Sequence, residues 1–202
     1  MEVSSTIVKE LREKTGAGFM DCKKALTETE GNLEKAVDYL RQKGLAAAAK
    51  KADRVAADGA VGAYVHPGGK IGVLVEINCE TDFVARTTEF QTLLKDMAMQ
   101  IAAANPRYVR RAEVSGEEIE REHEIYLRQA QESGKPEKFI EQIVQGKMER
   151  FYSEVCLLEQ PFIKDPEKKV SDVLTEAITR LREKIEVRRF ARYLLGEGVQ
   201  KN

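Results

Sequence analysis

The fold of this chain is decided by residues 71–86, which read IGVLVEINCETDFVAR. The first seven are apolar and rich in β-branched side chains, so they predict a β-strand from Ile71 to Ile77. The strand pattern is lost at Thr81-Asp82, where a polar residue pair typical of a helix start appears. The sequence therefore predicts a strand-to-helix turn that carries an aromatic residue, Phe83.

The position of Phe83 allows two interpretations. Turns lie on the protein surface, and an aromatic side chain held rigidly there is often a contact residue for a partner. Alternatively, the ring folds back and fills the core beneath the sheet. The spacing of residues leaves both interpretations open.

The neighbouring segments predict a small antiparallel sheet. Residues Ala60 to Val65 alternate as a strand does, and His66-Pro67-Gly68-Gly69-Lys70 separates them from the strand at Ile71 as a hairpin turn would. The run from Ile185 to Leu195 predicts a third strand near the end of the chain. The prolines at Pro161-Phe162 and Asp165-Pro166 predict a loop.

Helices are predicted to cover this sheet. Thr88 and Gln91 have the spacing of a capping box, and so have Ser115 and Glu118. The segments from about 116 to 158 share helical periodicity on both sides of a Gly-Lys-Pro break, which predicts an antiparallel helical hairpin. A further helix is expected from Ser171 onward. The fold class is therefore α+β.

The first 45 residues predict a bundle of three short helices. The helices are expected to begin at Ser4 or Ser5, at about Met20, and at Gly31-Asn32, and Gly44 is placed to cap the C-terminus of the third. We thus predict three parts: residues 1–45 as a three-helix domain, 46–57 as a linker, and 58–202 as an α+β core.

The Ala-rich linker carries the cations Lys50, Lys51 and Arg54. They are either a solvated surface or a contact for an acidic partner.

Composition excludes several classes of protein. The net charge of the 202 residues is −1, which argues against binding to nucleic acid through phosphate neutralisation. The first residues lack a signal sequence, and no apolar run reaches the ~20 residues that span a bilayer. The three cysteines are Cys22, Cys79 and Cys156; their odd number and wide spacing indicate a reducing compartment. We expect a cytoplasmic protein.

The sequence offers no support for enzymatic chemistry. Gly16-Ala17-Gly18 precedes a helix but does not follow a strand, as a nucleotide-binding loop would. The two histidines, His66 and His123, have no metal-ligand spacing around them. Cys79 lies beside two carboxylates, which disfavour a reactive thiolate. We therefore expect no catalytic residues, no metal, no cofactor and no small-molecule substrate.

Four stretches of the chain resemble one protein family. They read LREKTGAGFMDCKKAL at residues 11–26, NCETDFVAR at 78–86, QPF at 160–162, and FARYLLGEG at 190–198. In this order they resemble bacterial translation elongation factor Ts, and the first two are long enough to be specific. Family members often have Met-Met where this chain has Phe19-Met20, a change that keeps the apolar bulk.

The resemblance implies both a fold and a function. The fold is a ubiquitin-associated-like N-terminal bundle followed by one core module with a three-stranded antiparallel sheet, a short form that in some members is a homodimer. The function is exchange of guanine nucleotide on elongation factor Tu. Thr81, Asp82, Phe83 and Val84 correspond to the motif associated with displacing Mg2+ from that GTPase.

The N-terminal residues Arg12, Phe19 and Met20 correspond to those that grip the GTPase. On residue pattern alone, these side chains could instead pack inside the three-helix bundle. The main rival to the exchange function is a non-catalytic interaction module unrelated to translation, because a small helical bundle can bind other proteins through the same surface.

Overall fold

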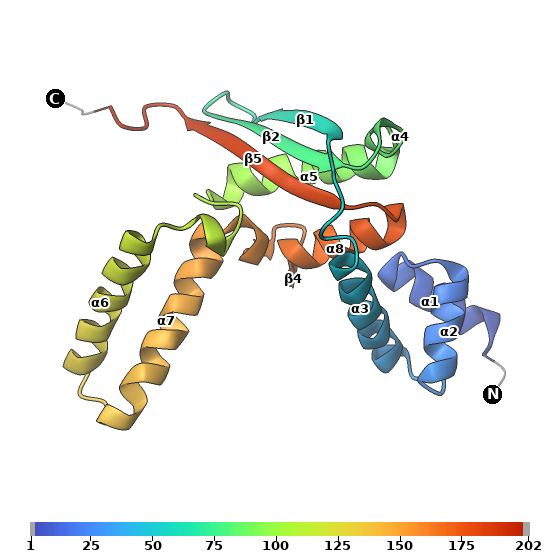
Figure 1. Cartoon of the computed structure of the whole chain (residues 1–202), viewed down its shortest axis with the longest axis horizontal. Coiled ribbons are helices and arrows are strands. Elements are labelled where there is room, and N and C mark those ends of the chain that lie inside the picture. Colours follow the sequence, from blue (N-terminus) through green and yellow to red (C-terminus); the bar gives the residue numbers. More distant parts are fainter. Residues whose placement is uncertain (1–2, 200–202) are drawn as a thin grey trace. The chain divides into compact units, whose positions relative to one another are not determined.

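The computed structural model describes residues 3–199, and it confirms the predicted α+β class (Figure 1). The outermost residues of the predicted first and last domains lie outside this range. The elements are α1 (Ser5–Thr15), α2 (Phe19–Glu28), α3 (Leu33–Ala49), β1 (Asp58–Val65), β2 (Ile71–Cys79), α4 (Asp82–Ala85), α5 (Thr88–Ala104), α6 (Gly116–Glu132), α7 (Ile140–Val155), β3 (Pro161–Phe162), β4 (Asp165–Lys169), α8 (Val170–Leu181) and β5 (Ile185–Leu194). Single 3-10 turns cover Arg111–Glu113, Glu137–Phe139 and Leu157–Glu159.

The chain divides into two compact units that interleave along the sequence. The first comprises the residues up to Gly62, then Glu76–Lys95 and Asp172–Arg188. The second comprises Ala63–Val75, Asp96–Ser171 and the residues from Arg189. The N-terminal helices and the turn after β2 therefore belong to the same unit. The division at residues 45 and 57 stays a prediction.

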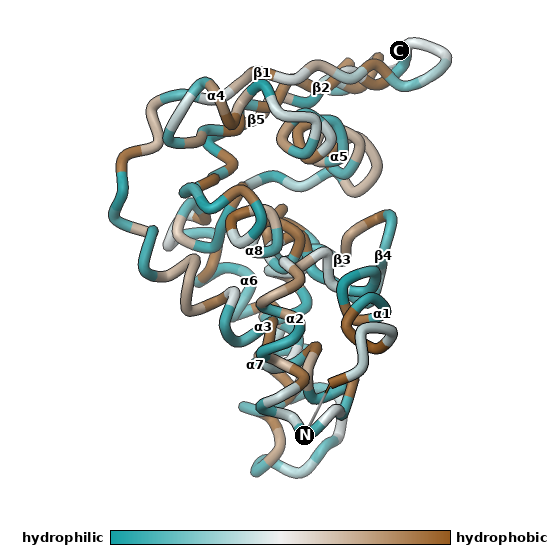
Figure 2. Tube along the Cα trace, turned by 90° about the vertical axis from the view of Figure 1, so that its right-hand side faces the viewer, coloured by the Kyte–Doolittle hydropathy of each residue, from teal (hydrophilic) through white to brown (hydrophobic). Residues whose placement is uncertain are grey.

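The first three helices enclose their own core. Figure 2 shows hydrophobic residues (brown) interspersed with hydrophilic ones (teal) along the helices, as amphipathic helices require. At its start, Asn32 accepts a hydrogen bond from the backbone N of Lys35 at 2.9 Å. The buried side chains of this bundle are Val8, Leu11, Ala17, Cys22, Ala25, Leu26 and Ala36.

The third helix is longer than predicted. It continues to Ala49, so the prediction that Gly44 caps it is wrong, and the helix enters the expected linker. Alanine is the strongest helix former, and the four alanines from Ala46 extend the helix. Gly44 serves a different purpose, because a Cβ there would lie 3.1 Å from the Thr179 hydroxyl of α8. Its missing side chain permits this close approach.

The sheet has the strand order β1-β2-β5. Alternate residues of β2 are buried, among them Val73, Val75 and Ile77, whereas Leu74 between them is exposed. Helix α5 runs along one face of the sheet (Figure 1), and Arg192 of β5 donates to its Ala102 carbonyl at 3.3 Å. The three-stranded sheet predicted from sequence is confirmed.

Three local predictions need correction. Thr87, not Thr88, caps α5, because its hydroxyl accepts from the backbone N of Phe90 at 3.3 Å. The loop expected near Pro161 is a short antiparallel pair, β3 with β4. Helix α8 begins at Val170, which places Ser171 inside its first turn. The first and third errors shift a helix boundary by one residue, the least certain feature of a helix, and the second is a missed pair of short strands.

The predicted helical hairpin is formed by α6 and α7, which lie side by side (Figure 1). Ser115 caps α6 as predicted, accepting from the backbone N of Glu118 at 3.2 Å. The two helices share a core of Val114, Ala130, Val144, Met148, Phe151, Val155 and Cys156.

The base of the hairpin is fixed by two buried glutamines. Gln100 donates to the Gln160 side-chain oxygen at 3.2 Å and accepts from the backbone N of Ile163 at 2.8 Å. Gln160 donates to the Glu154 carbonyl at 2.9 Å. A buried amide is costly unless it is hydrogen-bonded, so this pair fixes one arrangement of the segments that it joins.

A search of residues 3–199 for a membrane-spanning helix found none with the required length and hydrophobicity.

Candidate partner-binding site

The turn between β2 and α4 presents one aromatic side chain to solvent. Thr81 is the N-cap of α4, with an extended backbone and a hydroxyl that accepts from the backbone N of Val84 at 3.4 Å. Val84 and Ala85 are 6% and 5% exposed, whereas Phe83 is 78% exposed. The interpretation in which Phe83 fills the core is therefore wrong.

The geometry of a single helical turn explains this contrast. Successive helical residues point about 100° apart, so burial of Val84 and Ala85 directs Phe83 away from the protein. Val84 cannot offer its side chain to a partner in this arrangement, and its buried side chain anchors the turn instead. Thr81 and Asp82 are exposed beside the ring.

Asp82 forms a surface ion pair. Its carboxylate lies 2.7 Å from the Arg86 guanidinium, and the two side chains are 64% and 80% exposed. Such exposed pairs contribute little to stability, about 0–1 kcal/mol. Asp82 is therefore free to exchange this contact for one with a partner at little cost.

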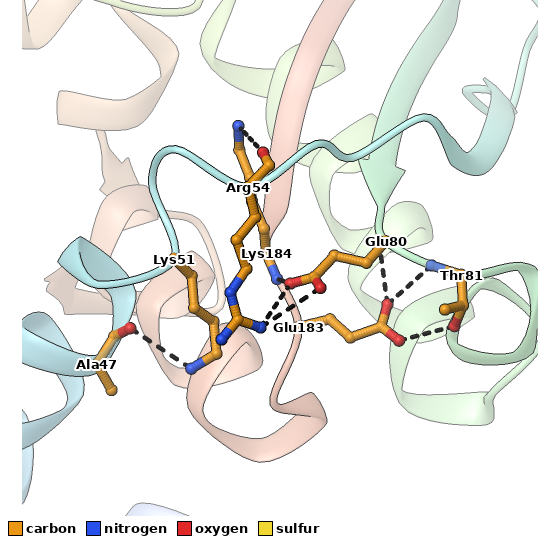
Figure 3. Close-up of polar contacts among 7 residues, drawn as sticks. All are labelled: Ala47, Lys51, Arg54, Glu80, Thr81, Glu183 and Lys184. Atoms are coloured by element: carbon orange, nitrogen blue, oxygen red, sulfur yellow. Dashed lines mark hydrogen bonds and ion pairs between the residues drawn. The ribbon is translucent and has the colours of Figure 1, made fainter.

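The backbone of the turn is held by a carboxylate from a distant segment. Figure 3 shows Glu183, which precedes β5, reaching the turn. One of its oxygens accepts from the backbone N of Glu80 at 3.0 Å and of Thr81 at 3.1 Å. The other accepts from the Thr81 hydroxyl at 2.7 Å.

Glu80 makes the reciprocal contact. Its carboxylate accepts from the backbone N of Lys184 at 2.6 Å and pairs with the Arg54 guanidinium at 3.3 Å. The hydrogen bond from Lys184, followed by the contact with Arg54, lowers the pKa of Glu80 below its ordinary value. The charged form is thus the one that the folded turn prefers.

Cys79 at the end of β2 is a structural residue. Its thiol is buried and donates to the Thr81 carbonyl at 3.1 Å. Burial, reinforced by the negative charge of Glu183, raises the pKa of this thiol. Because the thiolate is the nucleophilic form, Cys79 is not poised for covalent chemistry.

A second exposed group lies at the turn between α1 and α2. Met20 is 71% exposed, Phe19 is 47% exposed, and Arg12 in the last turn of α1 is also exposed. The interpretation in which these side chains fill the bundle core is wrong. They flank the turn at Gly16, and this turn belongs to the same compact unit as Phe83.

Groups suited to metal binding do not occur in the described part of the chain. Among residues 3–199, no three histidine, cysteine, aspartate or glutamate side chains are placed to hold an ion together. His66 at the hairpin end of β1 contacts the Tyr64 hydroxyl through Nδ1 at 3.0 Å.

Comparison with known proteins identifies the family of this chain. The family model described as Elongation factor TS matches residues 1–197. The chain belongs to the elongation factor Ts family. Its relatives include Elongation factor Ts of Desulforamulus reducens, 62% identical over 99% of this chain and 92% of the relative. Elongation factor Ts of Geobacter sulfurreducens is 62% identical over 100% of this chain and 93% of the relative.

Membership in the elongation factor Ts family assigns the chain a role as a translation elongation factor. This confirms the resemblance that the sequence motifs indicated. It argues against an interaction module unrelated to translation.

Sequence reasoning found the exposed residues of the site but missed Glu183. No motif marks this residue, which lies 102 positions from Thr81 between a helix and a strand. A carboxylate at such a position reads as an ordinary surface charge until the fold brings it to the turn.

Proposed function

We propose that this protein is a guanine-nucleotide exchange factor that binds the GDP form of elongation factor Tu and promotes GDP release. The observation that carries the proposal is the 78% exposure of Phe83 on a turn whose backbone is held by Glu183. A large apolar ring held outward by its own fold is suited to enter another protein.

Exchange on this proposal needs no covalent step. A factor that binds the nucleotide-free GTPase more tightly than the GDP-bound form must weaken GDP binding by the same ratio, because the two equilibria are linked. The chain therefore requires a binding surface and no catalytic residue, which agrees with the absence of catalytic motifs in its sequence.

The proposed point of action is the Mg2+ ion of the partner. Mg2+ bridges the nucleotide phosphates to the GTPase, so a distortion of its surroundings removes part of the nucleotide affinity. Phe83 would supply this distortion by inserting between two elements of the partner, with Thr81 and Asp82 beside it and Val84 anchoring the turn.

The energy available from one ring sets the size of the effect. A buried aromatic at the centre of an interface contributes ~2–4 kcal/mol. At about 1.4 kcal/mol per factor of ten, Phe83 accounts for roughly 30- to 1000-fold weaker GDP binding. Any larger effect requires further contacts, which we assign to Arg12, Phe19 and Met20 as a grip on the GTPase domain.

The proposal extends to the partners of the chain. Elongation factor Tu is the partner of the exposed turns, and we propose a homodimer as the resting state. Light scattering after gel filtration would show a mass of two chains, and a single-chain mass would contradict it. A pull-down from bacterial lysate should recover elongation factor Tu as the dominant protein; its absence would favour an unrelated interaction module.

The proposed function is tested by the Phe83→Ala variant. We expect the rate of GDP release from elongation factor Tu to fall more than tenfold, since the variant loses the ~2–4 kcal/mol assigned to the ring. Stopped-flow fluorescence with labelled GDP measures this rate at catalytic amounts of the factor.

Two controls accompany this measurement. The thermal melt of Phe83→Ala should match that of the original chain, because the ring is 78% exposed. Val61→Ala removes another exposed apolar side chain, on β1, and should leave GDP release unchanged. An unaltered release rate in Phe83→Ala would remove this residue from the mechanism.

A further inference from the structure

Both carboxylate oxygens of Glu183 accept hydrogen bonds from the turn after β2. The carboxylate accepts three hydrogen bonds, two from the consecutive backbone N–H groups of Glu80 and Thr81 and one from the Thr81 hydroxyl (Figure 3). Hydrogen bonds to an ionised acceptor are roughly twice as strong as neutral ones. The three donors lie immediately before Asp82 and Phe83 in the chain, so their positions set where α4 begins.

Glu80 in turn binds the backbone beside Glu183. This residue accepts from the backbone N of Lys184 at 2.6 Å, so the side chain of each glutamate binds the backbone beside the other. The Lys184 ammonium donates to the Arg54 carbonyl at 2.9 Å, and the Arg54 guanidinium pairs with Glu80. Figure 3 shows these contacts as one network of three segments. We refer to Arg54, Glu80, Thr81, Glu183 and Lys184 as the turn clamp.

Phe83 depends on this clamp for its orientation. The ring is 78% exposed, so few contacts of its own can hold it. Its direction follows from the backbone of α4, which has only four residues and is too short to be stable alone. Two features fix that backbone: the Val84 side chain is buried in the protein, and the turn clamp holds the start of the helix.

We infer that Glu183 is a positioning residue for nucleotide exchange, acting through the backbone at Thr81 on the orientation of Phe83. This inference rests on the proposed function and deepens it. A ring that must insert into a partner loses part of its binding energy if it has first to be ordered, and pre-organisation by the clamp avoids that loss. Glu183 itself need not touch the partner.

The experiment compares Glu183→Ala with Glu183→Gln. Alanine removes all three hydrogen-bond acceptors, and we expect the maximal rate of GDP release to fall roughly tenfold, as expected for misplacement of a functional group. Glutamine retains one oxygen for the two backbone N–H groups and can donate to the Thr81 hydroxyl, so it should restore the rate to within about threefold. The concentration of factor that gives half the maximal rate should change little, because the exposed residues at α1 and α2 are untouched.

A second background separates positioning from a general structural role. In the Phe83→Ala chain, adding Glu183→Ala should lower the rate by less than about twofold, since a residue that acts through the ring has nothing left to orient. If the double variant loses the full product of the two single-variant effects, the inference is overturned. Glu124→Ala serves as the control, because it removes an exposed carboxylate paired with Arg128 in α6, which carries neither exposed turn, and should leave the rate unchanged.

Failure of the inference differs from failure of the proposed function. If the original chain does not accelerate GDP release, the proposed function is wrong. If it does, and Phe83→Ala is impaired while Glu183→Ala keeps the full rate, only the positioning role is wrong. Should Glu183→Ala fail to fold, Thr81→Val removes the hydroxyl that donates to Glu183 and also accepts from the backbone N of Val84. It should lower the maximal rate severalfold; an unchanged rate would overturn the inference.

Discussion

The two exposed turns of the first compact unit are built differently. The α1–α2 turn is held by short-range contacts: the backbone N of Gly16 donates to the Arg12 carbonyl at 2.8 Å, and the Thr15 hydroxyl donates to the Leu11 carbonyl at 2.7 Å. The partners of these hydrogen bonds lie within a few residues of one another, and a distant neighbour of Gly16 is the Arg180 side chain of α8, which a Cβ at Gly16 would approach to 3.1 Å. The β2–α4 turn is held by Glu183, 102 residues from Thr81.

This difference bears on how each turn would work. A turn held by local contacts keeps its shape wherever the helices around it are formed, and suits a contact surface that provides affinity. A turn held by a distant carboxylate has its position fixed relative to the strands that carry it, and suits a group that must push on a partner. We therefore expect the first turn to control how tightly elongation factor Tu is bound, and the second to control how fast GDP leaves.

The strongest test of this comparison is Leu26→Ala. Leu26 is fully buried in the core of α1–α3, and its truncation should cost about 2–5 kcal/mol of bundle stability. We expect amide hydrogen exchange to speed up across α1–α3 while the amide of Thr81 keeps its protection. Loss of protection at Thr81 would show that the second turn depends on the bundle after all.

A smaller effect is expected from Met20→Ala, which removes a 71% exposed side chain. We expect a loss of about 1–2 kcal/mol in binding, or roughly 5- to 30-fold in affinity for elongation factor Tu. Titration of the factor in the GDP-release assay should show a higher half-maximal concentration and an unchanged maximal rate. A lower maximal rate at saturation would contradict the division of roles.

The smallest effect concerns pH. The pKa of Glu80 lies below the ordinary glutamate value of 4.5, so its carboxylate stabilises the fold above that pH and the contribution is lost as pH falls through the lowered pKa. The neutral variant Glu80→Gln lacks this dependence.

Thermal melts at about pH 6 and about pH 3.5 measure the difference for Glu80. We expect the loss in melting temperature on acidification to be about 1–3 °C smaller in Glu80→Gln than in the original chain. Glu118 and Glu149 also have lowered pKa values and act in both chains equally, so the comparison isolates Glu80. Equal losses in the two chains would mean that the clamp adds nothing measurable.

Much of this protein is determined locally by its sequence. The apolar run from Ile71, the cap at Ser115 and the motif around Phe83 each act over a few residues, and they are sufficient to predict strands, helices and an aromatic residue on the turn after β2. The end of α3 was not predictable, because glycine is a common signal for a helix end and yet Gly44 lies inside α3, where α8 packs closely against it.

Only the tertiary structure decided which distant residues each side chain contacts. Whether Phe83 points outward depended on the burial of Val84, and what holds its turn depended on a glutamate far along the chain. Periodicity and capping arise from neighbouring residues and can be read from them. Contacts between residues a hundred positions apart form only when the chain folds, so no local sequence pattern indicates them.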